Sequence, residues 1–104
     1  MELDVPGNAY EYLIGMFAQT AGKMGGEFYT PVNMSELVAR LATVGLSEAK
    51  SVSDCACGSG GLLSQVGKYV KVGQYFGQEL TSTTYNLARI NMLLHGMQQK
   101  RTHI

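Results

Sequence analysis

The chain has 104 residues, of which 45% are hydrophobic and 15% charged, so it carries enough apolar material for a core and fewer charges than the roughly 25% of an average domain. This composition excludes a disordered chain, and the length allows one domain or part of one. Eight cations balance eight anions, so net charge gives no case for binding to nucleic acid or to a membrane.

The first predicted element is a helix over residues 9–21. Asn8 and Glu11 have the spacing of a capping box, and apolar side chains then recur at helical spacing. The glycine-rich link over residues 22–26 ends this helix. The N-terminus lacks the basic start of a signal peptide and no apolar run reaches the ~18 residues of a membrane span, so we expect a cytoplasmic chain.

A second helix is predicted to begin at Thr30 and Pro31. Thr30 can cap the helix, and Pro31 suits the first helical position because its missing N–H costs nothing there. Gly45 is the expected left-handed stop. The stripe expected to be buried consists of Leu37, Val38, Leu41 and Ala42.

The second half of the chain alternates strands and helices. The order expected is a strand at residues 50–54, a glycine loop at 55–61, a helix from 62, a strand at 74–79 and a helix from 82 or 83 to 95. On the last helix Leu87, Ile90 and Leu94 form one face, with Ala88 and Met92 beside it and Gly96 as the stop. Asn91 lies on this apolar stripe and is expected to be a buried, hydrogen-bonded amide.

The residues best suited to bind a ligand lie in and beside the glycine loop. A strand that ends in a carboxylate, Asp54, followed by a glycine-rich turn and a helix, brings backbone N–H groups together at a ligand. Glu79 at the tip of the next strand can accept both hydroxyls of a ribose. Together these features predict a site for an adenosine-containing cofactor.

The carboxylate at Asp54 favours S-adenosylmethionine over NAD. Dinucleotide sites place a pyrophosphate at this point, and a carboxylate repels phosphate. The same carboxylate suits an α-amino group, and the methionine end of S-adenosylmethionine is a zwitterion beside a sulfonium cation. Two alternatives stay open at this stage, a nucleotide- or NAD-binding half-domain and a non-enzymatic assembly module that binds neither cofactor.

Four motifs in this order and spacing resemble the modification subunit of type I restriction–modification systems, an adenine-specific DNA methyltransferase family. They are residues 26–31 (Gly-Glu-Phe-Tyr-Thr-Pro), 54–63 (Asp-Cys-Ala-Cys-Gly-Ser-Gly-Gly-Leu-Leu), 77–79 (Gly-Gln-Glu) and 84–96. The opening residues 7–14 also resemble the stretch that leads into the catalytic domain of that family. The resemblance thus covers nearly the whole chain.

The resemblance implies an α/β, Rossmann-like methyltransferase fold that binds S-adenosylmethionine. By this likeness residues 1–48 are a helical lead-in and residues 49–104 the first βαβα cofactor-binding unit. The motif residues implied to lie over or hold the methionine end of the cofactor are Glu27, Phe28, Tyr29, Thr30, Pro31, Val32, Asp54, Gly58, Ser59, Gly60 and Gly61. Glu79 matches the ribose ligand.

Two departures from the family pattern matter. Family members usually carry proline directly after the aspartate, where this chain has Cys55, and this predicts a less rigid loop. The catalytic motif Asn/Asp-Pro-Pro-Phe/Tyr is absent, since the chain has prolines only at Pro6 and Pro31. With about two strands found, we expect an incomplete sheet, no catalytic residue in this chain, and self-association through uncovered apolar surface.

The partners implied by the resemblance are DNA, through the full-length parent, and the specificity and restriction subunits of the complex. Cys55 and Cys57 are expected to be thiols, because disulfides are rare in the cytosol. Their spacing, and that of His95 and His103, does not match the usual zinc ligands, so no metal is expected.

Overall fold

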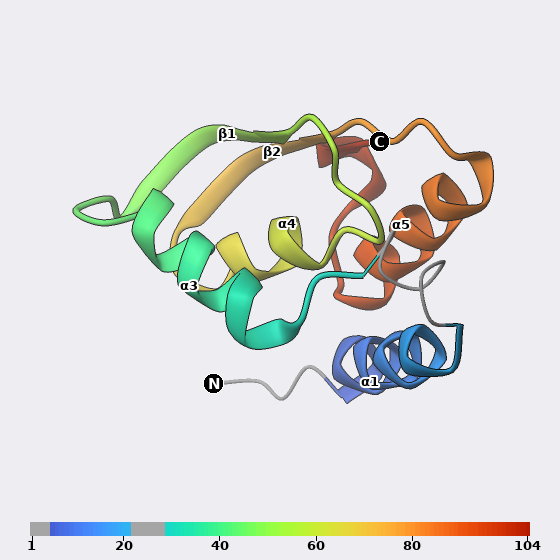
Figure 1. Cartoon of the computed structure of the whole chain (residues 1–104). Helices are drawn as coiled ribbons and strands as arrows, with labels where there is room; N and C mark the ends of the chain where they lie inside the picture. Colours follow the sequence, from blue (N-terminus) through green and yellow to red (C-terminus); the bar gives the residue numbers. More distant parts are fainter. Residues whose placement is uncertain (1–4, 22–28) are drawn as a thin grey trace.

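The computed structural model describes residues 5–21 and 29–104, and its element order is that of an open α/β sheet (Figure 1). The elements are α1 (Val5–Ala21), α3 (Val32–Ala42), β1 (Glu48–Asp54), α4 (Gly61–Val66), β2 (Lys71–Gly77), α5 (Ser82–Leu94), the 3₁₀ helix η1 (Gln99–Arg101) and β3 (Thr102–His103). The predicted alternation of strand, glycine loop, helix, strand and helix is confirmed. The third strand, β3, lies in the tail, which the sequence marked only as basic and polar.

The three strands form a parallel sheet in the order β1-β2-β3. Its two crossovers run through α4 and α5, as parallel neighbours require. Asp54 at the end of β1 is paired with Gly77 at the end of β2, so both strands end at the same edge. The ring of Phe76 stacks on His103 of β3, with centroids 4.9 Å apart.

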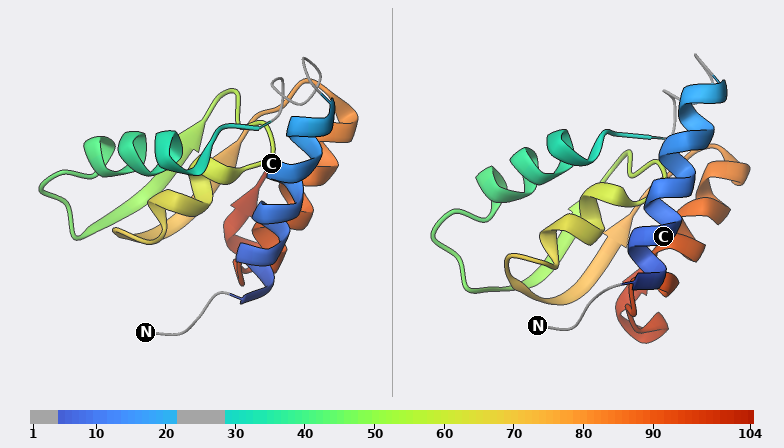
Figure 2. Two further views of the ribbon diagram at one scale, coloured as in Figure 1. Left: turned by 60° about the horizontal axis from the view of Figure 1, so that its bottom comes forward. Right: turned by 90° about the horizontal axis from the view of Figure 1, so that it is seen from below.

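The core lies between the sheet and the helices. Leu63 and Val66 of α4 and Ala88 and Met92 of α5 are buried in one cluster with side chains of β2. In Figure 2, α3 runs beside α4, and α1 runs beside α5, which agrees with the contacts between these pairs. The glycine loop between β1 and α4 therefore lies where the sheet edge meets α4 and α5.

Helix α1 begins at Val5, four residues before the predicted start. Pro6 fits the first turn, where no backbone N–H is needed for an intrahelical bond. Asn8 is already helical and exposed, so the predicted capping box is wrong.

Within residues 5–21 and 29–104, no helix has the length and apolar character needed to cross a membrane.

Helix α3 buries a different face from the one predicted. Its buried residues are Ser35 and Ala39, whereas Leu37 is 53% exposed and Leu41 67% exposed. At 100° per residue, Leu37 and Leu41 lie on the side of the helix opposite Ser35 and Ala39. Two small side chains let α3 approach α4 closely, so the predicted buried stripe, which also included Val38 and Ala42, is exposed.

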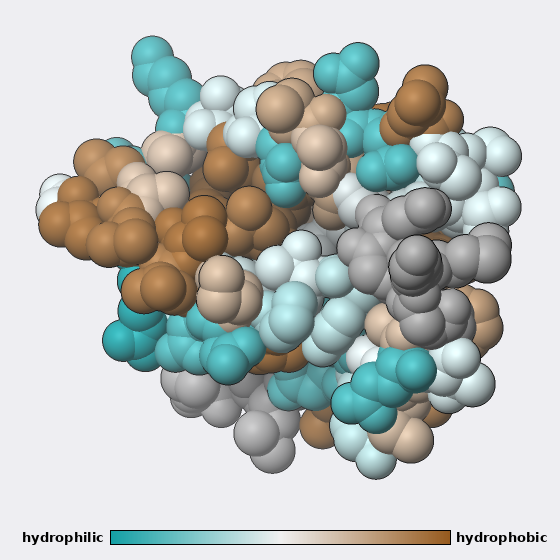
Figure 3. Space-filling view, in the orientation of Figure 1, coloured by the Kyte–Doolittle hydropathy of each residue, from teal (hydrophilic) through white to brown (hydrophobic). Residues whose placement is uncertain are grey.

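The exposed apolar side chains of α3 continue into the turn after it. Besides Val32 at the start of the helix, they are Met34, Leu37, Val38, Leu41, Val44 and Leu46. Figure 3 shows hydrophobic surface gathered over the C-terminal half of α3 and this turn. We refer to these six residues as the α3 apolar face.

The beginning of α3 lies one residue later than predicted. Pro31 is the N-cap, without a capping hydrogen bond from a side chain, so Thr30 does not cap this helix. The Pro31 carbonyl accepts the backbone N–H groups of Met34 and Ser35, both at 3.0 Å.

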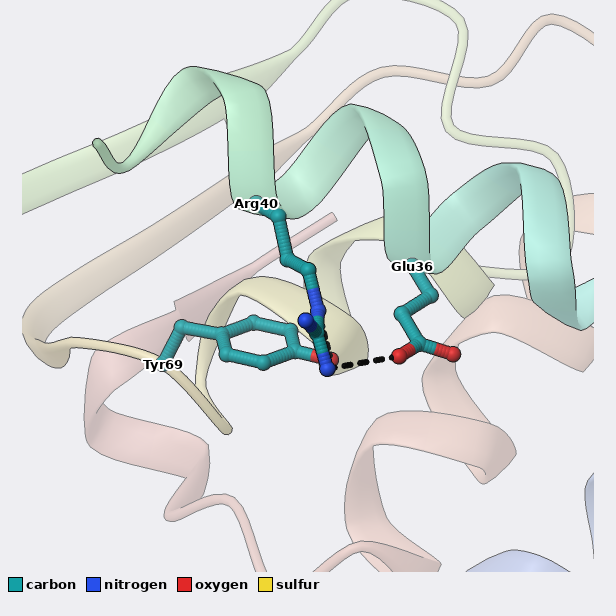
Figure 4. A network of polar contacts seen from close by, with 3 residues as sticks. All are labelled: Glu36, Arg40 and Tyr69. Atoms are coloured by element: carbon teal, nitrogen blue, oxygen red, sulfur yellow. Dashed lines mark hydrogen bonds and ion pairs between the residues drawn. The ribbon is translucent and has the colours of Figure 1, made fainter.

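A polar contact holds the outer side of α3 to the turn after α4 (Figure 4). Arg40 Nε donates a hydrogen bond to Tyr69 Oη at 3.3 Å, and the guanidinium lies 5.2 Å from the centre of the Tyr69 ring. Arg40 Nη2 also pairs with Glu36 Oε1 at 2.9 Å, one helical turn away. This pair is largely exposed, so we expect it to contribute little to stability.

Helix α5 is buried through a face displaced from the predicted one. Its buried residues are Thr84, Ala88, Asn91 and Met92, and Ile90 of the predicted stripe is 46% exposed. The two glycine stops are confirmed, because Gly45 has φ +79° and Gly96 φ +77°.

Candidate functional site

Backbone hydrogen bonds between the two strands extend past the ends of β1 and β2 into the glycine loop. Gln78 N–H donates to the Asp54 carbonyl at 2.9 Å, and Cys57 N–H donates to the Gln78 carbonyl at 2.9 Å. Beyond this ladder Gly58 (φ +56°) and Gly60 (φ +87°) take left-handed conformations that favour glycine. Gly60 is the N-cap of α4, so the loop turns straight into the helix.

The two predicted carboxylates lie on either side of this loop. Asp54 Oδ1 accepts the backbone N–H of Ala56 at 3.1 Å. Glu79 Oε1 accepts the N–H of Gly58 at 3.2 Å, and Glu79 Oε2 accepts the N–H of Thr81 at 3.0 Å. Each carboxylate oxygen has two acceptor sites, so Glu79 holds the loop and keeps acceptor capacity for a ligand.

The negative potential of these carboxylates acts inside the loop. Burial, followed by the charges of Asp54 and Glu79, raises the pKa of the Cys57 thiol from 9.0 to about 11. Cys57 therefore stays protonated near neutral pH and is a poor nucleophile. The charges of Asp54 and Glu79 make the potential in the loop negative, whereas burial, the largest cause of this shift, disfavours a charge of either sign.

The two glycines at the start of α4 lie near α5 and α1. A Cβ at Gly60 would lie 3.5 Å from Met92 Sδ and 3.7 Å from Ala88 Cα, which is ordinary van der Waals contact, so the left-handed φ is what favours glycine there. A Cβ at Gly61 would lie 3.5 Å from Glu11 Oε1 of α1. This side of the loop therefore has α5 and the Glu11 carboxylate of α1 as its neighbours.

The segment before α3 faces α1. A Cβ at Gly15 would lie 3.0 Å from Tyr29 Oη, which places the tyrosine ring against that helix. Tyr29 and Val32 line a cavity of about 310 Å³ together with Glu11 and other residues of α1, Gln65 of α4, Lys68, and His95 after α5. Thr30 and Pro31 are exposed, while Glu27 and Phe28 lie outside the described residues.

The contact that sequence reasoning missed joins Glu11 to the loop through Asn91. Asn91 is a buried amide, as predicted, and its Nδ2 donates to Glu11 Oε1 at 2.7 Å and to the Ser59 carbonyl at 2.9 Å. Glu11 carried only the predicted capping role. A polar residue in the buried stripe of α5 was the available signal, but it named no partner on α1.

Both cysteines are free thiols, Cys55 exposed and Cys57 buried. In the part of the chain that the structure describes, no group of three or more His, Cys, Asp or Glu side chains is arranged to hold a metal ion.

A parallel sheet with a glycine loop at the carboxyl end of its first strand and an acidic residue at the end of its second defines the Rossmann-like class of cofactor-binding proteins. The sequence matches the family model described as N-6 DNA methylase over residues 1–104. The chain belongs to this family.

Relatives agree with the resemblance found in the motifs. The chain is 49% identical over 107 residues to the type I restriction enzyme MpnII methylase subunit of Mycoplasma pneumoniae, covering 98% of this chain and 20% of the relative. It is 34% identical over 102 residues to the MjaIX methylase subunit of Methanocaldococcus jannaschii, covering 91% of this chain and 18% of the relative.

A solved structure agrees as well. The type I restriction-modification system methyltransferase subunit from Streptococcus thermophilus superposes with a TM-score of 0.84 at 42% identity, covering 96% of this chain and 22% of that chain. The chain therefore spans about a fifth of the length of the relatives it matches. The predicted resemblance to type I modification subunits and the predicted incomplete Rossmann-like fold are confirmed.

Proposed function

We propose that this chain binds S-adenosylmethionine at the glycine loop, as the cofactor-binding part of a type I DNA adenine methyltransferase. The observation that carries the proposal is the pair Asp54 and Glu79 on either side of a loop opened by left-handed Gly58 and Gly60. Residues 1–48 serve as the helical lead-in and residues 49–104 as the cofactor-binding unit.

The residues of the loop fit the parts of the cofactor. Glu79 would accept the ribose hydroxyls with the acceptor sites that Gly58 and Thr81 leave free. Asp54 would face the α-amino group, and Ser59, Gly60 and Gly61 would lie along the methionine moiety. Residues 29–32 would cover that end. When bound, the cofactor supplies an electrophilic methyl group on its sulfonium.

The negative charges of Asp54 and Glu79 distinguish the proposed site from one that binds a nucleotide or NAD. Burial, and after it the charges of these two carboxylates, raises the pKa of Cys57, and the carboxylates would repel a pyrophosphate as they repel a thiolate. Calorimetric titration of the chain with S-adenosylmethionine and then with NAD tests the choice. We expect heat of binding from the first ligand alone; binding of NAD alone would favour the nucleotide site, and binding of neither would favour an assembly module.

Family membership supports the remaining parts of the proposal. The names of the relatives describe methylase subunits of type I restriction enzymes, so the parent would act in the cytoplasm on DNA, with specificity and restriction subunits as partners. The transferred methyl group would go to the exocyclic amine of adenine.

The chain of 104 residues is expected to bind the cofactor without turning it over. It holds no Asn/Asp-Pro-Pro-Phe/Tyr motif to place the adenine amine, and correct placement supplies much of the rate of such a transfer. Incubation with adenine-containing DNA and methyl-labelled S-adenosylmethionine should give no label above a no-protein control. Label incorporated by chain purified free of any full-length enzyme would contradict this expectation.

Self-association is expected through the α3 apolar face, because exposed apolar surface of this kind drives contact between chains. Light scattering at tens of micromolar should detect a dimer or a larger species. Leu41→Glu places a charge in the middle of the face and should shift the species to monomer, whereas Glu36→Gln, at a partly exposed position of the same helix, should not. A sharp monomer peak for the unchanged chain would contradict the prediction.

A further inference from the structure

Three elements far apart in the sequence meet at one buried amide. Asn91 is 0% exposed, and its Nδ2 donates one hydrogen bond to Glu11 Oε1 of α1 and another to the Ser59 carbonyl of the glycine loop. Ser59 itself is 3% exposed. The amide of α5 therefore connects α1 to the loop through both of its N–H groups.

Chemistry fixes the orientation of this amide. Glu11 and the Ser59 carbonyl are both acceptors, so only the NH₂ end of Asn91 can face them. A rotated amide would place Oδ1 against a carboxylate and a carbonyl, which is repulsive. Oδ1 instead lies buried without a hydrogen-bond partner. The two donated bonds therefore hold the side chain in its only suitable orientation.

The other neighbours of this part of the loop are α5 and α1. A Cβ at Gly60 would be in ordinary van der Waals contact with Ala88 and Met92 of α5, and one at Gly61 with the Glu11 carboxylate. Glu79 holds the loop at Gly58, on its β2 side. Within the loop and α4, Gly60 N–H donates to the Cys57 carbonyl at 2.9 Å and Ser64 Oγ to the Gly61 carbonyl at 2.8 Å. The Asn91 bond to Ser59 is the contact that ties this side of the loop to α5, and Glu11 makes it a charge-assisted network.

We propose that Glu11 and Asn91 are positioning residues that hold residues 59–61 in the cofactor-binding conformation. The proposal rests on the proposed function for its ligand, S-adenosylmethionine, although its effect on the loop can be measured without ligand. Glu11 acts through Asn91, and removal of the carboxylate leaves the amide free to turn away from Ser59. Loosening should then be local to the loop.

Amide hydrogen exchange on the full chain tests the local effect. The reporters are the N–H groups of Gly58, Gly60 and Ser64, which the structure bonds to Glu79, Cys57 and Gly60. Glu11→Ala should speed their exchange about tenfold, the size of effect of losing a hydrogen bond to a charged group, while the amides of β2 keep their rates. Glu11→Gln keeps an acceptor for Asn91 and should restore rates to within about threefold.

Matched controls separate this effect from a general loss of stability. Glu36→Ala removes another partly exposed helical carboxylate, whose partner is Arg40, and should leave the loop rates unchanged. Asn91→Asp keeps the shape of the amide but loses at least one of its two N–H donors, because even a protonated carboxyl has a single O–H, so it should loosen the loop as Glu11→Ala does. Asn86→Asp makes the same change at an exposed position of the same helix and should have no effect.

The exchange rates and the cofactor affinity can each contradict the positioning role. Unchanged loop rates in Glu11→Ala, or equal acceleration at β2, would overturn the positioning role. The affinity of S-adenosylmethionine should fall with the loop rates, about tenfold in Glu11→Ala and little in Glu11→Gln; a loosened loop with full affinity would also overturn it. If the unchanged chain does not bind the cofactor, the proposed function fails, while the exchange rates still decide whether the pair holds the loop.

Discussion

Glu79→Ala is expected to weaken the binding of S-adenosylmethionine at least tenfold and the binding of adenosine to the same degree. Two hydrogen bonds from the ribose hydroxyls to a carboxylate contribute about 1.5–3 kcal/mol each, and about 1.4 kcal/mol already corresponds to tenfold. Glu79→Gln keeps one acceptor oxygen and should fall between. Calorimetric titration of both ligands against each variant measures these ratios.

Glu79 has a second role that the experiment must separate from ribose binding. The structure bonds its two oxygens to the N–H groups of Gly58 and Thr81, so its removal also frees the loop. Asp54→Ala provides the comparison, because Asp54 bonds Ala56 of the same loop. Asp54→Ala should weaken the binding of S-adenosylmethionine more than that of adenosine, since in our proposal Asp54 would face the methionine end, whereas Glu79→Ala should weaken both alike. Unchanged affinity for both ligands in folded Glu79→Ala would remove Glu79 from the site.

The elements of this fold could be predicted because their signals are local. Gly45 and Gly96 end helices in the left-handed conformation, and the run from Asp54 to Gly61 places a loop between a strand and a helix. Such signals depend on residues a few positions apart. The order of elements, and the position of both carboxylates at one sheet edge, followed from them.

The buried faces could not be predicted because apolar content alone does not say which side of a helix meets a neighbour. On α3 the small residues Ser35 and Ala39 pack inward, and the larger Leu37 and Leu41 point away. Close approach of two helices selects small side chains at the contact, and that choice depends on α4.

The Glu11–Asn91–Ser59 network could not be predicted from the sequence for a related reason. Its members come from α1, α5 and the loop, and Glu11 and Asn91 are 80 residues apart. In the sequence Glu11 had a sufficient local explanation as part of a capping box, and Asn91 had one as a buried amide. Only the packing of α1 on α5 brings them together.

The largest expected effect on stability comes from a single methyl group on β2. A Cβ at Gly73 would lie 2.5 Å from the backbone carbonyl oxygen of Lys50 on β1, whereas at Gly77 the nearest atoms are the side-chain ends of Ile104, Cys57 and Leu63, at 2.8, 3.0 and 3.2 Å. Side-chain ends can shift, but the backbone of a paired strand cannot move without breaking the sheet.

Gly73→Ala should therefore lower the free energy of unfolding by about 2–3 kcal/mol, at the upper end of overpacking costs, and the melting temperature by roughly 10 °C. Gly77→Ala should cost less. The conformational entropy that alanine removes from the unfolded chain acts in the opposite direction, by about 0.4–1 kcal/mol, so a small change at Gly77 is compatible with crowding there. Thermal and urea unfolding of both variants, with Ser51→Ala at an exposed position of the neighbouring strand β1 as control, measures the ranking. A Gly73→Ala chain as stable as the Ser51→Ala control would mean that β1 and β2 do not approach each other at Lys50 as closely as described.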